Sequence, residues 1–204
     1  MEKKYIRFCQ NFHKKLLCCL LLTSFLTAAN ENELHKSEYT NQVDRAIKSL
    51  SANDIKDLTL GNGMGFAKVA ELNGYPGPKH VLDMQEELSL EKEQIRSIKL
   101  IFEEMKSQAR LQGQTLISLE KSLNEHFSNA TITNDALEGA LKNISEVRSN
   151  LRYIHLSAHI QTTEILSESQ IKKYNQLRGY NGNPCEKIPA GHNKEMWMLH
   201  NGCN

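Results

Sequence analysis

The sequence predicts an all-α protein: a long antiparallel helical hairpin with short flanking helices. Between Lys79 and Asn183 the chain has no proline, the residue that most strongly interrupts a helix. Over the same stretch, apolar residues recur at seven-residue intervals in two separate runs. Strand-like alternation of apolar and polar residues is absent from the sequence. Together these observations favour helices throughout.

Residues 1–29 have the order of parts found in a secretory signal peptide. Basic residues come first, an apolar run follows at 16–26, and Thr27, Ala28 and Ala29 offer small residues for cleavage. The apolar run is shorter than the ~20 residues that a helix needs to cross a bilayer, and no later segment is long and uncharged enough. The sequence therefore predicts export, a flexible polar segment at 30–41, and a mature chain that does not span a membrane.

The charge of the mature chain argues against nucleic acid as a partner. The full sequence has 25 Lys and Arg against 24 Asp and Glu. Five of the basic residues and one acidic residue fall in the predicted signal peptide, which leaves 20 against 23 and a net charge of −3. Binding to nucleic acid depends on basic side chains that neutralise phosphates. We therefore predict that the partner of the mature chain is not a nucleic acid.

Two of the five cysteines, Cys185 and Cys203, remain after cleavage. An even pair in an oxidising compartment is more often a disulfide than two free thiols. Such a bond would staple the C-terminal tail at 181–204 and would stabilise it by about 3 kcal/mol in the chain-entropy model.

The main domain is predicted to span 42–180 and to begin with short helices. Apolar residues in 43–50 (VDRAIKSL) and 66–72 (FAKVAEL) suggest two of them, and Ser51 offers a helix cap for a third. The glycines of GNGMG at 61–65 separate these helices, and residues 75–78 (YPGP) form a turn.

Two long helices should then fold back on each other. Each run carries two rows of residues at heptad spacing. In the first run, one row is Ile95, Phe102, Ala109, Leu116 and Leu123, and the other is Ile98, Met105, Gln112, Leu119 and His126. In the second run, one row is Leu137, Ile144, Leu151, Ala158 and Ile165, and the other is Leu141, Arg148, His155 and Thr162. Turn and capping residues at 128–134 separate the runs, which predicts an antiparallel hairpin. A further helix at 167–177 and a short one capped by Asn193 complete the chain.

Two short motifs carry a resemblance to a known family. Leu90 and Gln94 in LEKEQ, and Leu166, Ser167 and Gln170 in LSESQ, resemble the LTxxQ motif that occurs twice in the Spy/CpxP family of periplasmic stress proteins, which includes heavy-metal sensors. The stretches 71–84 (ELNGYPGPKHVLDM) and 151–159 (LRYIHLSAH) also resemble members of that family. The likeness covers 42–180, and the first motif departs from the pattern because Glu91 stands where Thr or Ser is usual.

The resemblance implies an LTxxQ-type four-helix arrangement that pairs into a cradle-shaped homodimer in the periplasm. The concave face of such a dimer holds unfolded or regulatory envelope proteins, without catalysis. The best-known chaperone of the family has a basic cradle, whereas this mature chain is slightly acidic.

A metal site is a second possibility within the hairpin. His155 and His159 are four residues apart, so both imidazoles lie on one helix face. In a hairpin that turns near 130, position 155 lies opposite about 106, which brings Glu104 and Met105 within reach; Glu120 is a more distant candidate. The alternative is that His155 is a partly buried polar residue bonded to a neighbour, with His159 exposed.

The tail offers a weaker candidate metal site. His192, Met196 and His200 recur every four residues, and imidazole and thioether ligands suit copper or zinc. Alternatively, the apolar residues around Met196 dock a stapled tail on the helices. Cysteines joined in a disulfide cannot act as ligands.

Catalysis is not predicted. Gly-x-Ser-x-Gly and His-Glu-x-x-His motifs are absent, and GNGMG at 61–65 lacks the strand and the Lys-Ser/Thr of a phosphate loop. Two hypotheses remain: a chaperone or adaptor that binds non-native or regulatory proteins, and a sensor or scavenger of heavy metals (Zn, Cu or Ni). Neither requires a bound cofactor.

Overall fold

The computed structural model describes residues 35–180, 185–186, 188 and 191–203, and these form helices without any strand. The elements are the 3-10 helix η1 (Thr40–Gln42) and the α-helices α2 (Ala52–Leu60), α3 (Lys68–Leu72), α4 (Pro78–Asp83), α5 (Lys92–Ser128), α6 (Asn134–Ile165), α7 (Glu168–Leu177) and α8 (Lys194–His200). The chain divides into two compact units, Met1–Asp44 and Arg45–Asn204. Of the first unit the structure describes only 35–44, which include η1; the predicted signal peptide lies outside the described residues.

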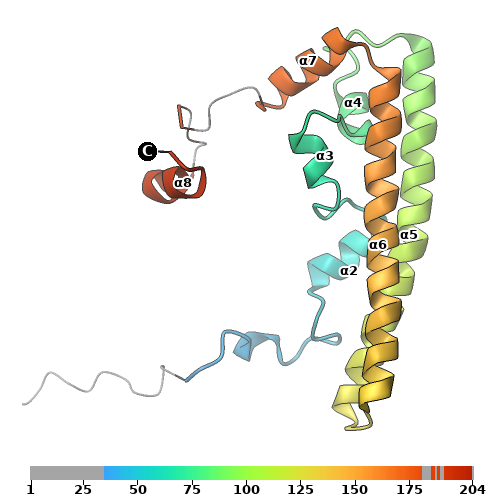
Figure 1. Ribbon diagram of the computed structural model, residues 1–204, viewed down its shortest axis with the longest axis vertical. Helices are drawn as coiled ribbons and strands as arrows, with labels where there is room; N and C mark the ends of the chain where they lie inside the picture. Colours follow the sequence, from blue (N-terminus) through green and yellow to red (C-terminus); the bar gives the residue numbers. More distant parts are fainter. Residues whose placement is uncertain (1–34, 181–184, 187, 189–190, 204) are drawn as a thin grey trace, which may run out of the picture. The chain divides into compact units, whose positions relative to one another are not determined.

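Helices α5 and α6 form the predicted antiparallel hairpin and pack side by side along their length (Figure 1). The turn between them occupies the predicted segment, and Thr133 begins α6 by accepting a hydrogen bond from the Ala136 backbone N–H at 3.3 Å. Among the heptad residues, Ala109, Leu116 and Leu151 are buried between the helices. The heptad spacing therefore identified the contact face of the hairpin.

The second row of α6 is divided between the interior and the surface. His155 and Thr162 are buried, whereas Leu141 and Arg148 are exposed. The hairpin is thus covered on this side near the middle and end of α6, where the short helices lie, and is open near its turn. Figure 1 shows α2, α3 and α4 lined up along one side of the hairpin.

Helix α2 packs closely on α5 because Gly113 leaves room for it. An added Cβ on Gly113 would overlap the carbonyl oxygen of Leu58 and lie 2.9 Å from its carbonyl carbon. Ser51 caps α2, as predicted, by accepting from the Asp54 backbone N–H at 3.1 Å, while Asp54 Oδ2 accepts from the Ser51 N–H at 2.8 Å. These reciprocal bonds satisfy two backbone donors at the helix start.

The prediction of a short helix at 43–50 is wrong. The segment forms turns and bends, although Ile47 and Leu50 are buried in the same core as Leu116 and Leu151. The Asn124 side chain of α5 accepts from the Lys48 backbone N–H at 3.2 Å. Contacts with the hairpin therefore replace the helical hydrogen bonds that the local pattern suggested.

A second core lies at the other end of the hairpin, where α4, α5, α6 and α7 meet. Its buried residues are Val81, Leu88, Ile98, Leu166 and Tyr174. Helix α4 was not predicted; it begins at Pro78, a favourable residue for the first turn of a helix. In the part of the chain described, no helix is both long and apolar enough to cross a membrane.

Candidate functional site

A cavity of about 150 Å³ lies between the hairpin and the segments that cover it. We call it the histidine cavity. It is lined by the loop before α3, the start of α4 and one face each of α5 and α6 (Gly61, Asn62, Gly63, Ala67, Gly77, Pro78, Lys79, His80, Phe102, Met105, Lys106, His155 and His159). Three imidazoles, a thioether and two lysines therefore surround one small space.

His155 is buried in this cavity with an unsatisfied ring nitrogen. Its exposed fraction is 3%, and Nε2 has no hydrogen-bond partner among the described residues. Burial, followed by the nearby positive charges of His159 and Lys106, lowers the pKa of His155 to about 4. The ring is therefore neutral at neutral pH, and Phe66 stacks on it with 5.9 Å between the ring centroids.

His159 is held in one orientation by the backbone. Its Nδ1 lies 2.7 Å from the Tyr75 carbonyl oxygen, a pure acceptor, so Nδ1 carries a proton and donates it to that oxygen. Nε2 faces Gly77, where an added Cβ would lie 2.9 Å away. His159 is 9% exposed, so the alternative of an exposed side chain is wrong.

Behind His159 lies the half-buried carboxylate of Glu71 in α3. Its Oε1 accepts from the hydroxyls of Tyr174 (2.6 Å) and Tyr180 (2.8 Å) and from Arg178 Nε (3.2 Å). Burial alone would raise the pKa of Glu71, but these two hydroxyls, with Arg178 and His159, outweigh it and hold the pKa below its usual range. Its Oε2 lies 3.7 Å from His159 Nδ1. These hydrogen bonds of Glu71 join α3 to α7 and to the residues that follow it, beside the histidine cavity.

The predicted ligands are only partly brought together. Met105 lines the histidine cavity together with His155 and His159, as the hairpin register suggested. Glu104 and Glu120 lie outside it. Glu120 is buried farther along the hairpin, where it accepts from Arg148 Nη2 at 2.9 Å and is bonded to Ser49.

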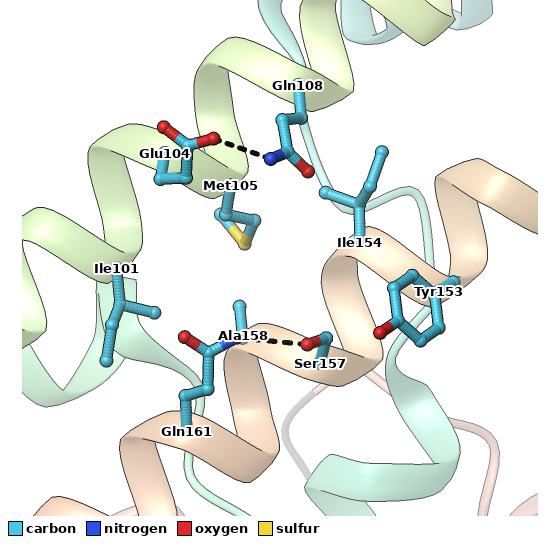
Figure 2. Close-up of a pocket in the computed structure, with 9 residues that line it drawn as sticks. All are labelled: Ile101, Glu104, Met105, Gln108, Tyr153, Ile154, Ser157, Ala158 and Gln161. Carbon is cyan, nitrogen blue, oxygen red and sulfur yellow. Dashed lines mark hydrogen bonds between the residues drawn. The ribbon is translucent and has the colours of Figure 1, made fainter.

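Glu104 lines a different hollow of about 240 Å³, between α5 and α6 (Figure 2). There it accepts a hydrogen bond from Gln108. Met105 lines both spaces, and Figure 2 shows its sulfur directed toward Ala158 between the two helices. In the described part of the chain, no three His, Cys, Asp or Glu side chains converge as a metal ion would require.

An apolar surface lies on the outside of α3, on both sides of it. One hollow of about 400 Å³ is lined by Val69, Ala70, Asn73, Tyr75, Leu156 and Ile160, and the other, of about 530 Å³, by Met64, Gly65, Phe66, Lys68, Val69, Leu72, Asn73 and Arg152. We call the two together the α3 groove. Val69, Leu72 and Ile160 are each exposed over half or more of their surface. Apolar side chains gathered in this way are typical of interaction sites.

The two LTxxQ-like motifs contact each other directly. Gln94 and Gln170 exchange a pair of hydrogen bonds, each side-chain amide donating to the other's oxygen at 3.0 Å. Gln94 Nε2 also donates to the Ile165 carbonyl at 2.9 Å. Gln94 and Gln170 further accept from the backbone N–H of Glu91 (3.0 Å) and Ser167 (2.9 Å). The motif glutamines thus fasten the starts of α5 and α7 together, and Leu166 is buried beneath them.

The tail contains the predicted disulfide, between Cys185 and Cys203, with 5.5 Å between the Cα atoms. Asn193 caps α8, as predicted, by accepting from the Met196 backbone N–H at 3.1 Å. His192 packs edge-on against Trp197, and Met196 and His200 are exposed. Because both sulfurs are bonded, Cys185 and Cys203 cannot act as metal ligands.

Sequence reasoning missed three residues that build this region, namely Glu71, His80 and Phe66. The stretch that contains the first two, ELNGYPGPKH, stood out only through its family resemblance. GNGMG at 61–65 was interpreted as a connector, but Gly61 and Gly63 line the histidine cavity. Comparisons with protein-family models, with curated proteins and with solved structures found no match to this chain.

Proposed function

We propose that the protein is a non-catalytic, periplasmic binding protein of the Spy/CpxP type, which holds apolar segments of non-native or regulatory envelope proteins. The α3 groove is the observation that carries this proposal. Its two hollows share Val69 and Asn73, so they offer one continuous, largely apolar surface beside the hairpin. Burial of an apolar side chain of the partner here would contribute about 25 cal/mol per Å² removed from water.

The contact between the two motifs supports the family assignment within this proposal. The LTxxQ-like segments are 76 residues apart in sequence, yet their glutamines form reciprocal hydrogen bonds. A pair of motifs with a shared structural role agrees with the repeated motif of the Spy/CpxP family. Pairing of two copies into a homodimer belongs to the same proposal, and sedimentation of the purified protein tests it.

The test is suppression of aggregation of a client protein whose disulfides are reduced. Leu72→Lys places a charge in the α3 groove, and Leu111→Lys makes the same change on α5, at a leucine that is 68% exposed and lies outside the groove. We expect wild type and Leu111→Lys to suppress aggregation and Leu72→Lys to lose most of this effect. Absence of protection by wild type at a molar excess, or equal loss in both variants, would refute the proposal.

The histidine cavity favours a second candidate function, the sensing or scavenging of a heavy metal. It places the imidazoles of His155 and His159 and the Met105 side chain around one space, and Nε2 of His155 has no hydrogen-bond partner among the described residues. Calorimetric titration with zinc, copper and nickel tests this function. Unchanged affinity in His155→Ala and His159→Ala would rule out the cavity and leave His192, Met196 and His200 of the tail as candidates.

A further inference from the structure

We propose that the histidine cavity binds a small oxyanion, of the class of inorganic phosphate or sulfate, through the ammonium group of Lys106 and a ring N–H of His155. This site is separate from the α3 groove, so it does not rest on the proposed function. It also makes the opposite demand to the metal site of the second candidate function, because the charge of Lys106 repels a cation and attracts an anion.

The side chains that line the cavity supply positive charge and no negative charge. Two lysines and three histidines are among the lining residues, whereas no aspartate or glutamate is. Lys79 is exposed, and its Nζ lies 2.6 Å from Asp83 Oδ2, so a carboxylate already neutralises it. Lys106 is therefore the lysine of this cavity whose charge remains available to an anion.

Lys106 is half-buried and lacks a carboxylate partner. None of the ion pairs among the described residues includes it. Its Nζ donates to Asn62 Oδ1 at 2.8 Å, and since an ammonium group has three N–H donors, others remain for a further acceptor. Burial, followed by the positive charges of Arg110 and Lys79, lowers the pKa of Lys106, and nearby carboxylates offset this only in part. A bound anion would supply the missing counter-charge.

His155 supplies the second half of the site, a buried nitrogen without a hydrogen bond. The side chain is 3% exposed, and its Nε2 has no partner in the part of the chain that the structure describes. Buried polar atoms normally bond to protein, to water or to a ligand. A neutral imidazole carries one N–H, which either nitrogen can hold, and an oxygen of the anion would accept from it.

The two groups face the same space from opposite helices. Lys106 belongs to α5 and His155 to α6, and both line the cavity. Their closeness is evident from electrostatics, since the charge of Lys106 is among the causes that lower the pKa of His155. Asn62 holds the ammonium group in place, and Phe66 stacks on the imidazole. One small ion can therefore contact both groups.

The size of the cavity restricts the ligand to a small anion. A volume of about 150 Å³ can hold a molecule the size of benzene. Phosphate and sulfate are smaller than this, whereas a nucleotide is much larger. Water can also enter a polar cavity and bond to His155, but it leaves the charge of Lys106 without a counter-ion. Lysine commonly binds phosphate as a point charge.

The experiment titrates the purified protein with inorganic phosphate and with sulfate at neutral pH, with sodium chloride added to keep the ionic strength constant. The thermal midpoint reports on binding to the folded state. Nuclear magnetic resonance of nitrogen-labelled histidine rings identifies the imidazole that the ion reaches. Lys106→Met keeps most of the aliphatic stem and removes the charge. Lys99→Met is the matched control, because Lys99 is an exposed lysine of α5 that does not line the cavity.

We expect one ion per chain, a midpoint that rises with phosphate or sulfate, and a shift of the His155 ring signals but not of those of His126 at the end of α5. Lys106→Met should bind at least tenfold more weakly, and Lys99→Met should bind as wild type does. No rise beyond that in chloride, equal weakening by both variants, or equal affinity of Lys106→Met and wild type would overturn the site. Unmoved His155 signals would also overturn it, even if Lys106→Met failed to fold.

Discussion

Replacement of Gly113 by alanine tests whether the close approach of α2 and α5 stabilises the fold. Gly113 is buried inside α5, where an added methyl group would overlap the carbonyl oxygen of Leu58. The overlap is with backbone atoms rather than with the end of a flexible side chain. Relief therefore requires α2 to move as a unit, together with Leu58, which is 2% exposed.

Two opposite contributions set the magnitude. Alanine is favoured over glycine inside a helix by about 1 kcal/mol. Overpacking of a close contact costs about 1–3 kcal/mol, and loss of the buried Leu58 side chain from its core would cost about 2–5 kcal/mol. The structural cost exceeds the gain in propensity, so we expect Gly113→Ala to lower the free energy of unfolding by about 1–3 kcal/mol.

Gly139 provides the matched control, since it is an exposed glycine inside α6 whose added Cβ would meet nothing within 4 Å. At this position the substitution changes only the helix propensity of the residue, so Gly139→Ala should stabilise the protein by up to about 1 kcal/mol. Urea denaturation followed by circular dichroism measures both variants. If Gly113→Ala were as stable as wild type, or if both variants changed stability in the same direction, the inferred contact between α2 and α5 would be incorrect.

Three further predictions concern hydrogen bonds. Gln94→Ala and Gln170→Ala should each destabilise the protein by about 1–3 kcal/mol, and a double-mutant cycle from urea denaturation should give a coupling of about 1 kcal/mol; purely additive effects would contradict the reciprocal bond. The pKa of Asp54 is lowered mainly by hydrogen bonds from Ser51. The Asp54 cap therefore stabilises the folded state fully above the unfolded pKa of about 3.9, and this stabilisation is lost as the pH falls through the lower folded pKa. Asp54→Asn should therefore cost about 0.5–1 kcal/mol at pH 7 and less at pH 3, measured by thermal unfolding at both pH values; an equal cost at both would contradict it. Tyr174→Phe removes a hydroxyl that donates to the Glu71 carboxylate at 2.6 Å and should cost about 1.5–3 kcal/mol at pH 7 in urea denaturation, whereas an unchanged midpoint would show that the bond does not stabilise the fold.

Local patterns predicted the helices well because short-range interactions produce them. Ser51, Ser167 and Asn193 cap the helices that follow them, and each bond spans only three residues. The segment at 43–50 shows the limit of this reasoning. Ile47 and Leu50 are buried against the hairpin from a non-helical backbone, and Val43 is exposed, which no local pattern reveals.

The candidate site was predictable only in part, for the same reason. Spacing placed His155 and His159 on one helix face, and the hairpin register brought Met105 to them. The same register could not distinguish Glu104 from Met105, because adjacent residues of a helix point in directions about 100° apart and only packing decides which one faces the cavity.

By itself, the sequence determined the all-helical class, the extent of the hairpin, most of the helix caps and the pair of histidines, since these depend on periodicity and on bonds between near neighbours. Only the tertiary structure decided that the loop at 61–67 and the start of α4 close a cavity over those histidines. It also decided that Glu71 is held by Tyr174 and Tyr180, and that the two motif glutamines meet. These contacts join residues far apart in the chain, and their formation depends on side-chain packing that no single segment encodes.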